Sequence, residues 1–215
     1  MSEEKKKFSF LSSVENFWYY HKWATMGISV LVILIILAFK SISVPDIPCD
    51  AKIMTVFSRV ETTGEINLES KLGSFVDDID GNGEKVVARK PFYVTSSGES
   101  NEDSIYLEQV EGIMAYADAD VVMMDDINYN RFKAKDFLCD LSEFVDLSSF
   151  DKDSIVYFNE KPVAINLKGS KLLKDMEFTF EDVYIGLMFI PEGKENEMMS
   201  GRENGAKIIT SLYKK

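Results

Sequence analysis

Histidine is almost absent from this sequence. The chain of 215 residues has one, His21, which lies near the N-terminus. The rest of the chain therefore has no imidazole to act as a general base, to activate a serine or cysteine nucleophile, or to bind zinc. Most hydrolase active sites are excluded, and only carboxylate- or lysine-based catalysis stays open. We do not expect an enzyme.

Cysteine is also scarce, with Cys49 and Cys139 as the two examples. In an oxidising compartment a disulfide between them would persist. Such a bridge would close a long loop and contribute about 4–5 kcal/mol in the chain-entropy model. The alternative is a pair of buried thiols. Because other parts of the sequence predict export, we keep the disulfide as a prediction.

Basic residues are outnumbered. The chain has 24 Lys and Arg against 36 Asp and Glu, a formal net charge of −12. A phosphate backbone is bound by an excess of basic side chains, so nucleic acid is not expected as a partner. The sequence has no glycine-rich phosphate loop either. Solubility is the simplest reason for the acidic charge, and cation binding is the alternative.

One long uncharged apolar run is present, at residues 23–39 (WATMGISVLVILIILAF). As a helix it would cover about 25 Å, close to the ~30 Å hydrocarbon core of a bilayer. Trp18, Tyr19 and Tyr20 precede it and are typical of a membrane interface. The run predicts one transmembrane helix in contact with the lipid bilayer.

Basic residues near the run predict its orientation. The cluster KKK at 5–7 and Lys22 precede it, and cytoplasmic flanks are enriched in such residues. We therefore expect a cytoplasmic tail over residues 1–22 and an extracytoplasmic domain over residues 49–215. The predicted localisation is the cell membrane, with a single pass.

Residues 40–48 are expected to form a stiff linker, because Pro45 and Pro48 cannot continue a helix. A cleavable signal peptide is the alternative to an uncleaved anchor. Ser41 and Ser43 have the small-x-small spacing of a cleavage site. The long segment before the apolar run favours the anchor.

The exported part reads as alternating strands and helices. Strands are predicted at 51–58, 85–94 and 120–124, with helices at 68–78 and 104–117. This βαβαβ order implies right-handed crossovers. We expect one α/β domain with three layers and a mainly parallel sheet. The further predicted elements are short helices at 129–135, 141–145 and 171–174, strands at 162–167 and 183–190, and a final helix at 195–213.

The segment DIDGNG matches the opening of a calcium-binding loop. Asp78, Asp80 and Asn82 stand at ligand positions 1, 3 and 5, and Gly83 stands at the turn position. Position 12 is Arg89 instead of the bidentate glutamate, so weak affinity is expected unless a carboxylate comes from elsewhere. The alternative is a helix-to-strand turn, for which Asp, Asn and Gly are typical.

A second candidate site follows the predicted strand at 120–124, in the segment DDINYNR. Ligands of open α/β sheets bind outside the carboxyl ends of the strands. The alternative is that Asp126 or Asn128 caps the next helix. The predicted ligand-binding residues, which include the end of the first strand, are Ser58, Arg59, Asp125, Asp126, Asn128 and Tyr129.

Several segments in order resemble a known family. They are ADVV at 119–122, FLCDLSEFV at 137–145, VAINLKGSKLL at 163–173 and YIGLMFIPEGKENE at 184–197. Together they resemble one lobe of bacterial extracytoplasmic solute-binding proteins of the type II periplasmic-binding fold, the receptors of ABC importers. Members of that family have two lobes and bind ligand between them. The resemblance therefore implies a fold, and the family's ligand contacts are not transferred to this chain.

The sequence as a whole predicts a membrane-anchored extracytoplasmic binding or interaction module. Its expected partner is another membrane or surface protein. One alternative is a weak calcium-dependent surface module that uses Asp78, Asp80 and Asn82, with Ca²⁺ as the one possible cofactor. A carboxylate-based enzyme is a further alternative.

Overall fold

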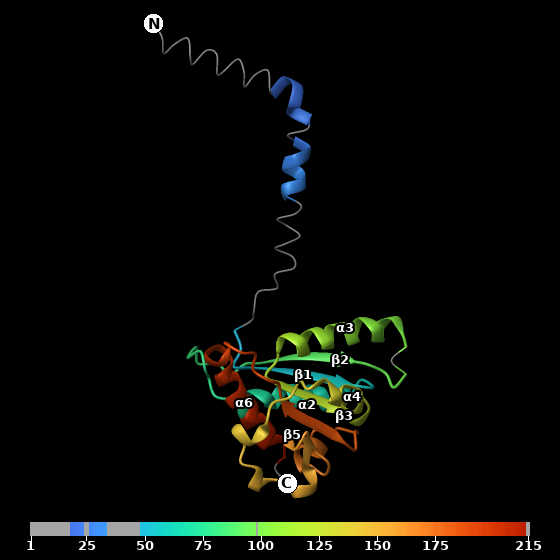
Figure 1. Cartoon of the computed structure of the whole chain (residues 1–215), viewed down its shortest axis with the longest axis vertical. Coiled ribbons are helices and arrows are strands. Elements are labelled where there is room, and N and C mark those ends of the chain that lie inside the picture. The colour runs from blue at the N-terminus through green and yellow to red at the C-terminus, as the bar shows by residue number, and fades with distance from the viewer. Residues whose placement is uncertain (1–17, 24–25, 34–47, 98, 214–215) are drawn as a thin grey trace. The chain divides into compact units, whose positions relative to one another are not determined.

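The computed structural model describes residues 18–23, 26–33, 48–97 and 99–213. The chain divides into two units, Met1–Ile47 and Pro48–Lys215. Figure 1 shows the elements of both, and almost all of the strands and helices belong to the second unit.

The prediction of a transmembrane helix at 23–39 is wrong. In the first unit, helix is described at 18–23 and at 26–33, and a span needs about 20 apolar residues. None of the helices in the described part of the chain is long and apolar enough to cross a membrane. The predicted single-pass membrane localisation, with a tail on one side and a domain on the other, therefore has no support. Most of the predicted tail and of the linker at 40–48 lies outside the described residues.

The second unit is built on a six-stranded sheet with the order β2-β1-β3-β6-β5-β4. Its strands are β1 (Ala51–Phe57), β2 (Val87–Tyr93), β3 (Val121–Asp125), β4 (Ile155–Phe158), β5 (Lys161–Asn166) and β6 (Val183–Leu187). β1 is parallel to β2 and β3, whereas β3–β6, β6–β5 and β5–β4 are antiparallel pairs. The domain is α/β, but its sheet is mixed and not mainly parallel.

The antiparallel pairing of β4 with β5 has a local cause at one edge of the sheet. β4 and β5 are joined by Asn159 and Glu160, whose φ angles are +48° and +67°. Two successive positive φ angles make a tight hairpin turn, and a hairpin joins antiparallel strands. The predicted βαβαβ half is parallel because its crossovers are helices.

Helices cover both faces of the sheet, which gives three layers (Figure 1). α3 (Asn101–Tyr116) and α4 (Asp126–Phe132) pack on one face. α2 (Thr62–Leu72), α5 (Lys171–Asp175) and α6 (Glu195–Tyr213) pack on the other. Short 3-10 turns complete the unit at η1 (Gly73–Phe75), η2 (Lys133–Lys135), η3 (Leu141–Glu143), η4 (Leu147–Ser149) and η5 (Lys152–Ser154).

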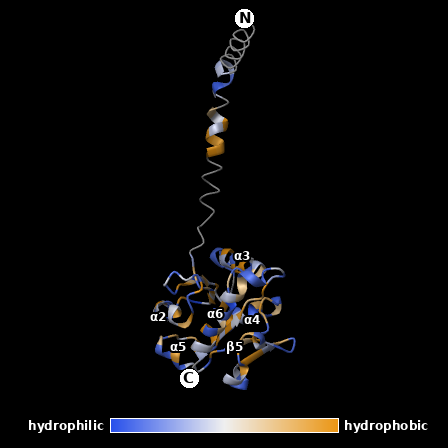
Figure 2. Ribbon diagram, turned by 90° about the vertical axis from the view of Figure 1, so that its left-hand side faces the viewer, coloured by the Kyte–Doolittle hydropathy of each residue, from blue (hydrophilic) through white to orange (hydrophobic). Residues whose placement is uncertain are grey.

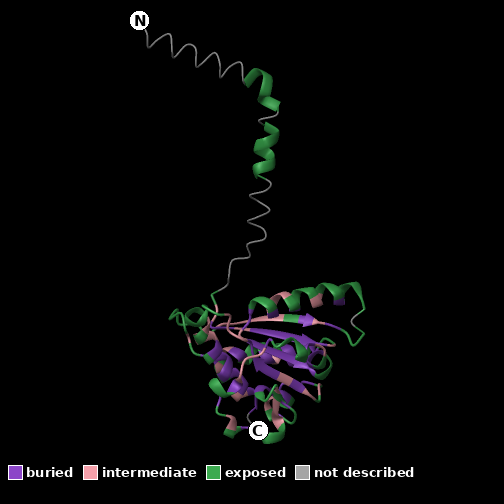
Figure 3. Ribbon diagram, in the orientation of Figure 1, coloured by how far each residue is buried: buried purple, intermediate pink, exposed green. Residues whose placement is uncertain are grey.

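The central strands β1 and β3 consist almost entirely of buried residues (Figure 3), and their apolar residues belong to the cores on both faces of the sheet. Figure 2 colours the ribbon by the hydropathy of each residue. Side chains alternate between the two faces of a strand. Ile53 and Val121 accordingly belong to the core under α2 and α6, while Met54 and Val122 belong to the core under α3. This double burial explains the continuously apolar sequence of β1 and β3.

α6 is fastened to the sheet by a buried arginine. The side chain of Arg202 donates to the carbonyls of Met188 at 2.7 Å and Phe189 at 2.9 Å. It also forms an ion pair with Asp120 at 2.5 Å. Asp120 in turn accepts the backbone N–H of Lys52 at 2.7 Å. Each of the three side-chain nitrogens of Arg202 thus donates to an oxygen next to the start of β3 or the end of β6.

Two glycines let α6 approach this closely. A Cβ on Gly201 would overlap the carboxylate of Asp120. A Cβ on Gly205 would lie 2.6 Å from Leu187 and 2.8 Å from Val121, both of which are fully buried. The glycines that weaken the helix propensity of α6 are therefore required by its packing.

The fold predicts opposite effects for two glycine-to-alanine changes inside helices. Gly205→Ala should destabilise the protein by about 1–3 kcal/mol, because two core side chains have to move. Gly112→Ala in α3 should be neutral or stabilise by up to about 1 kcal/mol, because a Cβ there meets nothing within 4 Å. Urea unfolding of both variants measures the difference. Equal effects would contradict this account of the packing of α6.

Candidate metal centre

Three carboxylates meet beside the start of β1. One oxygen each of Asp50, Asp78 and Asp80 lies within 4.8 Å of the others, and this group could hold a metal ion. Asp50 is buried, with 2% of its surface exposed, whereas Asp80 is exposed. The site therefore has a fixed inner ligand and an outer rim open to solvent.

Asp50 is held by backbone N–H groups within and just after the acidic loop. Its Oδ1 accepts the N–H of Ile79 at 2.6 Å, and its Oδ2 accepts the N–H of Val86 at 2.7 Å. Hydrogen bonds from N–H groups to a carboxylate are strong and fix its orientation. Asp50 thereby ties the loop at 78–83 to β1.

The loop itself is a tight turn. Asp78 accepts the N–H groups of Gly81 at 2.7 Å and Gly83 at 2.8 Å. The bond from Gly83 is the main reason that the pKa of Asp78 lies below its ordinary value. Gly81 and Gly83 have φ angles of +71° and +86°, which favour glycine. The turn interpretation of this segment is therefore correct, and the turn is what brings its carboxylates together.

Asn82, the third predicted ligand, forms hydrogen bonds within the turn. Its Oδ1 accepts the N–H of Glu84 at 2.7 Å, and its amide donates to Asp80 at 2.8 Å. Its oxygen thus completes the turn, and the third carboxylate of the group comes from Asp50. Arg89, which stands at position 12, lies away from the loop and pairs with Glu65 at 2.7 Å.

α6 supports the centre through one buried side chain. The amide of Asn204 donates to the carbonyl of Asp50 at 3.1 Å and to that of Asp77 at 2.8 Å. Its oxygen accepts the N–H of Asp77 at 3.0 Å. Lys207 adds an ion pair to Asp77 at 2.5 Å. Both halves of the centre are therefore attached to the same helix.

The donor set fits a hard cation. It consists of carboxylate oxygens, which suit calcium, magnesium or manganese and not the softer metals. Each oxygen that accepts one hydrogen bond keeps a second lone pair for an ion. Three carboxylates are fewer than the six to eight oxygens that calcium takes, so water or backbone carbonyls have to supply the others.

The second predicted site is a hydrogen-bonded network at the carboxyl ends of β1 and β3. Asp125 accepts the N–H of Ser58 at 2.6 Å, and both the N–H and the side-chain amide of Asn128 at 3.0 Å. Asp125 is the N-terminal cap of α4, so capping is done by this residue and not by Asp126 or Asn128.

Two other predicted residues of that site, Arg59 and Tyr129, contact different side chains. Arg59 donates to Thr179 at 2.8 Å and lies over the ring of Phe180 at 4.5 Å. Tyr129 stacks on Tyr184, with ring centroids 4.2 Å apart. The network thus joins the backbone N–H of Ser58 and the side chain of Asn128 to the carboxylate of Asp125.

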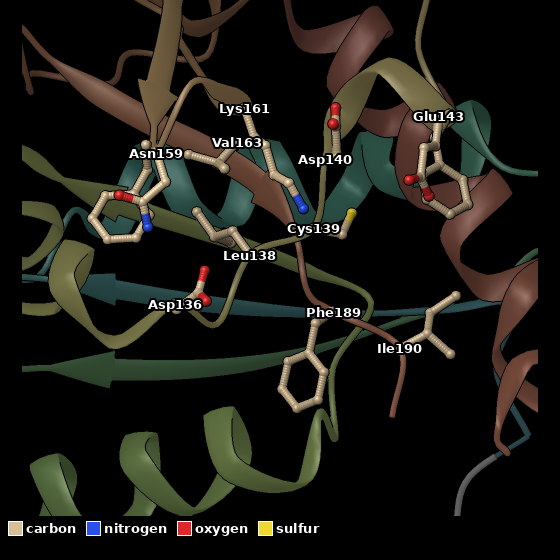
Figure 4. A pocket seen from close by; sticks show the side chains of 12 residues that line it. Asp136, Leu138, Cys139, Asp140, Glu143, Asn159, Lys161, Val163, Phe189 and Ile190 are labelled. Atoms are coloured by element: carbon tan, nitrogen blue, oxygen red, sulfur yellow. The ribbon is translucent and has the colours of Figure 1, made fainter. Parts of the chain in front are cut away.

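A cavity of about 480 Å³ lies beside Cys139, in the size range of small-molecule pockets (Figure 4). Its walls come from the segment after α4, the β4–β5 hairpin and the end of β6, and include Asp140, Lys161 and Phe189. The predicted disulfide is not formed: Cys139 is a free thiol, and no bond joins it to Cys49 although both are described. Burial raises the pKa of the Cys139 thiol to about 12.

This raised pKa predicts that the Cys139 thiol reacts slowly with alkylating reagents. The reactive species is the thiolate, so native Cys139 should be alkylated at pH 7.5 about a thousandfold more slowly than an unperturbed cysteine. Mass spectrometry after timed treatment with N-ethylmaleimide measures the rate. In denaturant without reductant both cysteines should react fully. Fast labelling of native Cys139, or incomplete labelling of the unfolded chain, would contradict this assignment.

The chain was compared with models of protein families, with curated proteins and with solved structures. None of the three comparisons gives a match. The resemblance to solute-binding proteins therefore rests on the sequence motifs alone, and the candidate centre rests on its geometry.

Proposed function

We propose that the second unit is a non-enzymatic binding module whose loop at 78–83 is ordered by a divalent cation, with calcium preferred. Asp50, Asp78 and Asp80 are the proposed carboxylate ligands. The observation that carries this proposal is the position of Asp50. It adds a buried carboxylate from another part of the chain to a loop that would otherwise offer two.

Electrostatics supports a cation at this place. Three carboxylates with atoms within 4.8 Å repel one another, and an ion among them turns that repulsion into attraction. The lowered pKa of Asp78 favours its ionised form, which is the form that binds a cation. The nearby lysines, Lys85 and Lys207, are paired with Asp77, which is outside the group.

The ion would act on the shape of a neighbouring surface. A cavity of about 290 Å³ is lined by Asp50 of the centre and by Ile79 of the loop, and Glu197 and Met198 of α6 form another wall. An ion that holds the loop against β1 therefore also holds one wall of this cavity. We infer cation-dependent contact with a protein partner at this face, and no nucleic acid partner because the chain is strongly acidic.

Calcium titration with a paired set of variants tests the proposal. The native protein should bind calcium with a dissociation constant on the order of 10⁻⁴–10⁻³ M, because the site has few carboxylates and is partly open. Asp80→Asn should weaken binding by at least about tenfold, since it removes one charged ligand. Isothermal titration calorimetry and the calcium-dependent shift in Tm measure both quantities.

Glu84→Gln is the matched control. It removes the same charge from an exposed residue next to the loop but outside the three carboxylates, so calcium affinity should change little. Asp78→Ala is a poorer test, because it also removes the acceptor of two backbone N–H groups. No binding heat and no shift in Tm with the native protein, or equal losses in both variants, would refute the proposal.

A further inference from the structure

The chain contains two Asn-Gly dipeptides, Asn82–Gly83 and Asn204–Gly205. In this dipeptide the backbone nitrogen of glycine can attack the side-chain amide of asparagine, because glycine has no side chain to hinder ring closure. The two copies have the same local chemistry. Their surroundings in the fold decide which one reacts.

Asn82 is exposed and its surroundings favour the reaction. Gly83, with φ of +86°, lies in open space, because a Cβ there would meet nothing within 4 Å. The N–H of Gly83 donates to the carboxylate of Asp78 at 2.8 Å, which holds this peptide group at the surface of the loop. The N–H of Glu84 donates to the Asn82 side-chain oxygen at 2.7 Å, where negative charge develops during attack.

Asn204 has the opposite surroundings. It is buried, with 1% of its surface exposed, and lies inside α6. Its side chain is engaged by Asp50 and Asp77. Gly205 is packed against Leu187 and Val121. Ring closure there would require α6 to unwind and leave the sheet, which makes the reactive form rare.

We propose that Asn82 is a site of spontaneous deamidation and that the fold protects Asn204. The nitrogen of Gly83 forms a bond to Cγ of Asn82, and the Cγ–Nδ2 bond breaks. The proton from Gly83 leaves with Nδ2 as ammonia, and a five-membered succinimide remains. Water then opens the ring to an aspartyl or an isoaspartyl residue. The net change is asparagine plus water to an acid plus ammonia, with no oxidant or reductant.

The consequence for the centre rests on the proposed cation-binding function. An aspartyl residue at 82 adds a carboxylate next to Asp80, with which Asn82 is now in contact at 2.8 Å. An isoaspartyl residue instead lengthens the backbone and breaks the turn. The first product should bind calcium more tightly than the native protein, and the second more weakly.

Peptide mapping by mass spectrometry of the aged full-length chain tests the inference. After incubation at mildly alkaline pH, the Asn82 peptide should convert at least about tenfold faster than the Asn204 peptide, since only the latter needs helix opening. Released ammonia should match the conversion. In denaturant the two peptides should convert at similar rates, which serves as the internal control. Conversion of native Asn82 no faster than that of Asn204 would overturn the inference.

The effect on the centre is measured separately with Asn82→Asp, which mimics the aspartyl product. Its calcium affinity should exceed that of the native protein by several-fold, as expected for one more charged ligand. Unchanged or lower affinity would refute this consequence alone. If neither protein binds calcium, the proposed function fails while the deamidation result stands. If calcium binds but Asn82 stays intact, the deamidation inference fails while the proposed function stands.

Discussion

The ion pair between Arg202 and Asp120 is the interaction on which the rest of the domain depends. It lies in the sheet–α6 interface, where Arg202 is fully buried and each of its three side-chain nitrogens donates to one oxygen. Burial disfavours a charge, and it raises the pKa of Asp120, so the pair is stable only with this complete set of bonds. Because the pair seats α6, it also positions Asn204, and through Asn204 both halves of the candidate metal centre.

Much of the fold could be predicted from local pattern. The apolar runs of β1 and β3 are strands buried on both faces, and the final helix spans Glu195–Tyr213 as expected. β4 could not be predicted, because Ile155–Phe158 is short and only partly buried. Strand direction in the second half depends on the β4–β5 hairpin and on the place of β6 between β3 and β5. The spacing of apolar residues along the chain predicts neither of these two features.

In the candidate metal centre, the ligands that are close in the sequence could be predicted and the distant one could not. The spacing of DIDGNG identified Asp78 and Asp80, because a turn brings neighbours together. Asp50 was missed, since it reaches the loop only through the pairing of β1 with β2, where Ala51 stands opposite Val87. Placing Asp50 beside Val86 needed that register. At the other end of the sheet, the position of Asp125 and Asn128 after a strand made them candidates, but their hydrogen bonds to each other could not be predicted.

The hydrogen bonds from Asn204 to the metal centre have a consequence for how the domain folds. Asn204 and Asp50 are hydrogen-bonded although they are 154 positions apart in the chain. The centre with its support from Asn204 is therefore complete only after both β1 and α6 have packed into the domain. Contacts between such distant residues close late in folding, since loop closure has to come first. A cation at this centre would therefore bind the folded domain and not the unfolded chain. By mass action it would then stabilise the native state in proportion to the logarithm of its concentration.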